Sequence, residues 1–79
     1  MTKAIHTKVF VIAGTVGDKI EYLGFDSASG GYPYCSAFIR DVTSDIDRAI
    51  LWLKDAEKNL PRLKNAKIYE ISLREYAMT

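Results

Sequence analysis

The sequence predicts one α+β domain, residues 1–79, in which an antiparallel sheet of about four strands carries a single amphipathic helix on one face. Three patterns support this prediction. Short β-branched and aromatic runs occupy the N-terminal half, apolar residues recur at helical spacing after residue 46, and apolar and polar residues alternate strictly from residue 69. The predicted order of elements is therefore β-β-β-α-β.

The N-terminal half has the composition of strands separated by turns. Three short segments predict strands, at residues 7–13, 19–25 and 35–40. The turn "GTVGD" follows the first of them, so the first two strands should form a hairpin. In the second strand, Ile20 and Tyr22 should share one face, and Glu21, Leu23 and Phe25 the other, because successive side chains point to opposite sides of a strand.

A helix is predicted next, because apolar residues recur three and four positions apart. This stripe consists of Ile46, Ala49, Ile50, Leu53, Ala56 and Leu60. Thr43 or Ser44 is expected as the N-cap, while Asp45 and Asp47 suit the positive end of the helix dipole. Pro61 cannot donate within the helical ladder, so the helix should end before it.

The final segment, "KIYEISLREY", predicts a strand with one buried and one wet face. The apolar set on one face is Tyr69, Ile71 and Leu73. The polar set on the other face is Glu70, Ser72 and Arg74. We expect the apolar set to pack against the helix and the polar set, with Glu21, to lie on the open sheet face, either solvated or available to a partner.

Composition excludes several classes of protein. The net charge of +1 gives no strong electrostatic argument for nucleic acid or for an anionic membrane. A lone cysteine, Cys35, cannot form an internal disulfide, which excludes a disulfide-stapled secreted mini-protein. The apolar run at residues 9–13 is too short for a signal peptide, and no window approaches a membrane span. A cytoplasmic protein is expected.

No catalytic or metal-binding constellation is present in the sequence pattern. A catalytic cysteine needs a thiolate, yet His6 is the only histidine and Cys35 stands beside a tyrosine at a strand start. Asp41, Asp45 and Asp47 lack the pattern of a calcium loop and are explained by the start of the helix. We therefore expect a non-enzymatic protein without a metal or cofactor.

Two surface features offer alternative contacts. The basic residues of segment 54–67 are Lys54, Lys58, Arg62, Lys64 and Lys67. Without interleaved aromatic residues a solvated face is the favoured interpretation, and weak nucleic-acid binding is the alternative. Trp52 borders the helix stripe and should pack at the edge of the core, while Leu51 lies nearly opposite; together they offer a homodimer or partner contact.

The most distinctive stretch is "FDSASGGYPYCS", residues 25–36. Its glycines permit positive φ angles, its Asp and Ser side chains can cap local N–H groups, and Pro33 restrains the tyrosines on either side. Rigid amphipathic rings beside Ser and Gly are typical of binding loops. The predicted partner-binding residues are Asp26, Ser27, Ser29, Gly30, Gly31, Tyr32 and Tyr34. The alternative is that one or both tyrosines fold back over the sheet.

This stretch, with the hairpin before it and "DIDRAILWL" after it, resembles small uncharacterised bacteriophage proteins that carry a "YLSFDSxSGGYPY" loop. The resemblance spans residues 20–53. Here Gly24 replaces the usual serine and Cys35 follows Tyr34 in place of a larger aromatic residue. The resemblance gives no activity, but it implies a phage accessory role, in which small proteins typically bind and block a host protein.

The expected function is therefore that of a non-enzymatic protein-binding module that inhibits a host protein, for example a defence protein. The alternative from another class is an oligomeric small-ligand protein that holds a nucleotide or anionic metabolite at the Ser/Gly loop. That loop lacks the Walker lysine and does not open onto a helix, which makes a nucleotide loop the weaker interpretation.

Overall fold

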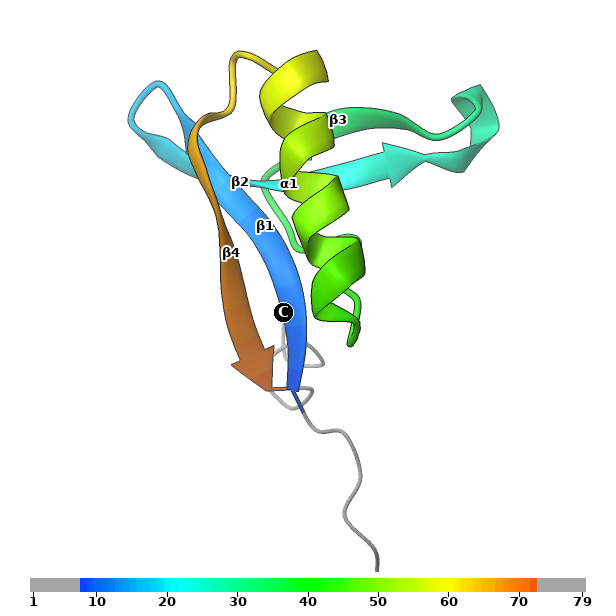
Figure 1. Cartoon of the computed structure of the whole chain (residues 1–79). Coiled ribbons are helices and arrows are strands. Elements are labelled where there is room, and N and C mark those ends of the chain that lie inside the picture. The colour runs from blue at the N-terminus through cyan, green and yellow to red at the C-terminus, as the bar shows by residue number, and fades with distance from the viewer. Residues whose placement is uncertain (1–7, 73–79) are drawn as a thin grey trace, which may run out of the picture.

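A four-stranded antiparallel sheet with one helix forms the domain, and this confirms the predicted α+β class (Figure 1). The computed structural model describes residues 8–72. The elements are β1 (Lys8–Val16), β2 (Lys19–Asp26), a short 3-10 turn (Ser27–Ser29), β3 (Tyr32–Ser36), α1 (Ile46–Asn59) and β4 (Lys64–Ser72). The strand order is β3-β2-β1-β4, so β3 and β4 are the edges.

The third strand differs from its predicted position, because it begins at Tyr32 and ends at Ser36 rather than spanning 35–40. Pro33 lies inside it and pairs with Phe25. Proline is tolerated in an edge strand, where its missing N–H need not join a ladder. Both Tyr32 and Tyr34 therefore belong to a strand rather than to the preceding loop.

The hairpin of β2 and β3 leaves the body of the sheet. β1 pairs with β2 only from Ala13 onward. Earlier in β1, the backbone of Phe10 instead exchanges two hydrogen bonds with Thr43, at 2.7 and 3.1 Å. The freed N–H of Phe25 donates to Asp41 Oδ2 at 2.8 Å. The hairpin consequently extends away from β1 and β4, as the cyan and green ribbon shows in Figure 1.

The core lies between α1 and one face of the sheet. Its buried cluster consists of Ile12, Leu23, Ala49, Ala56, Leu60 and Leu63. Ala49 and Ala56 are fully buried, and since they lie two turns apart on one side of α1, their small side chains let the helix approach the sheet closely. Of the predicted stripe, Ile46 and Ile50 are instead 44% and 40% exposed.

The predicted face assignment of β4 is wrong. Ile68 pairs with Ile12 and Glu70 pairs with Phe10, so Glu70 has the face of the core side chains, while Tyr69 and Ile71 lie on the face away from α1. Both faces of β4 carry apolar residues, and a one-residue error inverts every side chain. Glu70 avoids burial near the end of the strand, where it forms an ion pair with Lys8 at 3.8 Å.

Glu21 and Ser72, which were expected on the open sheet face, also have the orientation of the core side chains. Glu21 is opposite Gly14 and alternates with Tyr22, so it has the core-facing orientation of Leu23 rather than the open one. Ser72 pairs with Lys8 and has the same orientation as Glu70. Leu73 and Arg74 lie outside the described residues.

The N-cap of the helix lies one residue after Ser44 and two after Thr43, the two predicted caps. Asp45 is the N-cap, and its Oδ1 accepts from the N–H of Asp47 at 3.0 Å, while Thr43 Oγ1 accepts from Asp45 N–H at 3.1 Å. Asp45 accepts a hydrogen bond at the first turn and adds a negative charge there. It is therefore both the N-cap, which was expected at Thr43 or Ser44, and a favourable charge at the positive end of the helix dipole. The end is as predicted, since Leu60 closes the helix immediately before Pro61.

Replacing Asp45 by alanine is expected to lower the free energy of unfolding by about 1 kcal/mol, because the cap bond and the favourable charge are both lost. The matched variant Ser44→Ala should change it by less than about 0.5 kcal/mol, since Ser44 is exposed and not the cap. Urea denaturation measures both. Equal losses would contradict the assignment of the cap.

Candidate functional site

The hairpin tip, defined here as residues 26–34, comprises the turn between β2 and β3 and the first residues of β3, and the turn is fixed by its own hydrogen bonds. Asp26 Oδ1 accepts from Ala28 N–H at 3.0 Å, and the carbonyl of Asp26 accepts from Gly31 N–H at 2.8 Å. Gly30 N–H donates to Ser27 O at 3.3 Å. Gly30 and Gly31 have φ angles of 83° and 88°, the left-handed region that other residues rarely adopt.

The hairpin tip displays one aromatic ring. Tyr32 is 71% exposed, the most exposed of the large hydrophobic side chains in the described chain. It borders two hollows, one shared with Ser27 and Arg40 and the other with Asp55 and Asn59 from the end of α1. The fixed turn behind Tyr32 and the polar groups beside it give this ring the setting of a contact residue.

Tyr34 has a different role from Tyr32, although the sequence placed them together. Tyr34 pairs with Gly24, and a Cβ built on Gly24 would lie 2.9 Å from Tyr34 Cζ. The ring therefore lies over the bare backbone of Gly24 and is half-buried. A ring that covers a glycine on the neighbouring strand stabilises the pair of strands, so Tyr34 supports the hairpin while Tyr32 is presented to solvent.

The remaining predicted residues of the loop build the turn rather than an anion site. The N–H groups of Ala28, Gly30 and Gly31 all donate within the turn, and the Asp26 carboxylate is at its start. A phosphate would meet a carboxylate and amides that are already satisfied, so this geometry disfavours the nucleotide alternative. Ser27 is exposed, and the side chain of Ser29 is outside the described part of the structure.

Two other predicted contacts separate in the structure. Trp52 packs against Phe25 with ring centroids 5.2 Å apart, which confirms its place at the edge of the core. Leu51 is 65% exposed on the other side of α1. Because Trp52 is half-buried and Leu51 is exposed, Leu51 supplies more of the exposed apolar surface of this pair, and a homodimer or partner contact through the two stays a prediction.

The basic segment does not form one continuous stripe. Lys54 and Lys58 are exposed on α1, whereas Lys67 pairs with Ala13 and lies on the sheet face away from the helix. Cations on opposite sides of a sheet cannot track one phosphate backbone together, so this arrangement gives no support to nucleic-acid binding.

Cys35 and Asp41, which were considered for catalysis and metal binding, have roles in the fold. Cys35 is half-buried and packs against the core cluster, and His6 lies outside the described residues. Asp41 accepts from Phe25 N–H, so it anchors the hairpin instead of the helix start. Within residues 8–72, no group of three His, Cys, Asp or Glu side chains is arranged to hold a metal ion.

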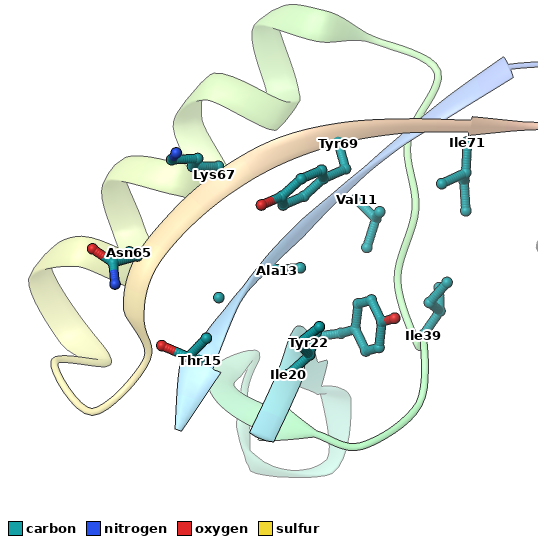
Figure 2. A pocket seen from close by; sticks show the side chains of 11 residues that line it. Val11, Ala13, Thr15, Ile20, Tyr22, Ile39, Asn65, Lys67, Tyr69 and Ile71 are labelled. Atoms are coloured by element: carbon teal, nitrogen blue, oxygen red, sulfur yellow. The ribbon is translucent and has the colours of Figure 1, made fainter. Parts of the chain in front are cut away.

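Sequence reasoning missed a hollow on the sheet face away from α1 (Figure 2). The residues that line it are Val11, Ala13, Gly14, Thr15, Ile20, Tyr22, Ile39, Asn65, Lys67, Tyr69 and Ile71. The unbroken apolar run at residues 9–13 of β1 was the available signal, because strands buried on both faces lack the alternation of half-buried ones.

Comparison of the chain with protein-family models, curated proteins and solved structures gives no match. Among the described residues, no helix combines the length and the apolar content needed to cross a bilayer.

Proposed function

We propose that this chain is a small non-enzymatic protein-binding module whose contact surface is the hairpin tip. One observation carries the proposal: Tyr32 is 71% exposed at the start of β3, directly after a turn that is held by three internal hydrogen bonds. An aromatic ring beside a rigid turn loses little conformational freedom when it is buried by a partner, and tyrosine is enriched among the residues that dominate binding energy.

The contact is made by side chains rather than by adding a strand to the sheet. β3 is an edge strand, but Pro33 at its second position supplies no N–H group to an incoming strand. Proline on an edge is one of the features that prevent strand addition. The Tyr32 ring accordingly docks in a groove of the partner, with Ser27 and Asp26 beside it as polar contacts, and the bulk of the domain then occludes that groove.

The kind of partner follows from the resemblance to phage proteins alone. On that basis the chain is a phage-encoded accessory protein that acts in the cytoplasm of the host cell by binding and inhibiting a host protein, for example a defence protein. The proposal requires no cofactor, since inhibition by occlusion involves no chemical step.

A pull-down from bacterial host lysate tests the hairpin tip. The native chain should retain one specific protein that Tyr32→Ala loses, while Leu51→Ala retains it. Leu51 is the matched control, because it is 65% exposed, close to the value for Tyr32, but lies on α1. With the purified partner, Tyr32→Ala should weaken binding by about thirtyfold, equivalent to about 2 kcal/mol.

Thermal unfolding of each variant shows whether the fold is intact. Retention by Tyr32→Ala together with loss by Leu51→Ala would move the interface to the helix. A lysate in which the native chain captures nothing more than a control protein would contradict the proposal for that host.

A further inference from the structure

The sheet face opposite α1 is hollowed rather than flat. Its floor is β1, where Val11 is 1% and Ala13 is 5% exposed, although the helix lies on the other side. β2 and β4 form the two sides, and Ile39, from the segment between β3 and α1, closes one end (Figure 2). Apolar groups with so little exposure indicate a recess with side walls rather than an exposed apolar patch.

The recess has the size of a site for a small molecule. Its volume is about 410 Å³, within the range of ligand pockets. A ligand that enters this recess must displace the waters that otherwise fill it. Most of its lining is apolar, so those waters have few hydrogen-bonding partners there, and an apolar ligand body that displaces them is favoured.

The two ends of the recess differ in polarity. The polar end carries Thr15, Asn65 and Lys67, and Figure 2 shows them together on one side. The more apolar end is formed by Val11, Ile39 and Ile71, with the Tyr22 hydroxyl directed toward Ile39. A ligand that matches this lining is amphipathic, with its apolar part at one end and its polar group at the other.

The backbone at the polar end is specially shaped. The pairing of β1 with β4 shifts between Ala13 and Thr15, so that Asn65 and Ala66 both lie opposite Gly14. Asn65 has a φ of 55°, a left-handed conformation that asparagine adopts more readily than most residues. Bulges of this kind redirect side chains and are frequent beside binding sites.

Charge indicates the polar group of the ligand. Among the described residues that line the recess, Lys67 carries the only charge. Lys67 has no carboxylate at ion-pair distance within residues 8–72, where the one ion pair joins Lys8 and Glu70. A cation without a partner at the rim of an apolar recess complements an anion.

We propose that this recess binds a small amphipathic anion, namely a monocarboxylate with an apolar body. Its carboxylate pairs with Lys67. Its apolar part covers Val11 on the floor of the recess and Ile71 at the end away from Lys67. This site is separate from the hairpin tip, so either proposal can fail without the other.

Octanoate is a suitable probe, with 1-octanol as the neutral and octylammonium as the cationic analogue of equal chain length. In NMR titrations below micelle-forming concentrations, octanoate should bind saturably and shift the amide signals of β1 and β4 around Ala13 and Lys67. Octanol should bind about fivefold more weakly, because it lacks the ion pair, and octylammonium more weakly still.

Variants separate the charge from the recess. Lys67→Met should reduce octanoate binding about fivefold and leave octanol binding unchanged. The matched control Lys54→Met removes a lysine from the exposed side of α1 and should leave both affinities unchanged. Ala13→Ile fills the floor of the recess and should abolish binding of both probes, with Lys67→Met as the independent test if that variant fails to fold.

Several results would overturn the proposal. Equal binding of octanoate and octanol by the native chain would show that Lys67 recognises nothing. Signal shifts at Tyr32 or Leu51 in place of β1 and β4 would put the probe elsewhere. Sedimentation as a dimer, with these same β1 and β4 signals depending on protein concentration and no octanoate binding, would assign the recess to a second copy of the chain.

Discussion

Gly14→Ala is expected to lower the free energy of unfolding by about 3 kcal/mol, because β1 and β4 lie too close together for a side chain at this position. A Cβ built on Gly14 would lie 2.5 Å from the Lys64 carbonyl oxygen and 3.2 Å from Ala66 Cα. Both atoms belong to the backbone of β4, so no side-chain rotation relieves the overlap. The strand must move, and its pairing with β1 is disturbed.

Gly17→Ala is the matched control. Nothing lies within 4 Å of a Cβ at Gly17, but its φ of +66° is the left-handed conformation of the β1–β2 turn. The cost there is conformational, about 1 kcal/mol, and Gly17→Asn should recover part of it. Urea denaturation of the three variants measures the order. A Gly14→Ala variant no less stable than Gly17→Ala would show that β4 yields easily to added volume.

The helix and its end were predictable because their signals are local. The spacing of the apolar stripe and the position of Pro61 depend only on neighbours in the sequence, and α1 ends at Asn59 as that pattern requires. The faces of β4 were not predictable in this way. Residues 69–73 alternate, but the register with β1 places Tyr69 opposite Val11 rather than beneath the helix.

In the candidate site, too, features set by neighbouring residues in the sequence were predictable and those set by contacts between strands were not. Positive φ at Gly30 and Gly31 follows from local turn chemistry and is observed. The different roles of Tyr32 and Tyr34 do not, because Tyr34 is held by Gly24 on the neighbouring strand, ten positions earlier in the chain. The hollow on the open sheet face likewise needs three strands and Ile39 to be brought together, which no single segment encodes.

Ile12→Ala is expected to have the largest effect on stability, a loss of about 3–4 kcal/mol, because Ile12 is 1% exposed at the centre of the core. For 79 residues a free energy of unfolding of roughly 4–12 kcal/mol is typical, so this one cavity removes a large part of it. Ile12→Val removes a single methyl group and should cost about 1 kcal/mol. Guanidinium denaturation measures both.

Comparing Ile20→Ala with Ile12→Ala tests whether the face away from α1 serves folding or ligand binding. Ile20 lies in the partner strand of the same hairpin and lines the recess, but it is 66% exposed, so its truncation should cost less than about 0.5 kcal/mol. If Ile20→Ala destabilised the chain as much as Ile12→Ala, the face away from α1 would be a second part of the core. A small loss, accompanied by weaker octanoate binding, instead assigns Ile20 to ligand recognition, because its side chain would then contribute to binding while contributing little to folding.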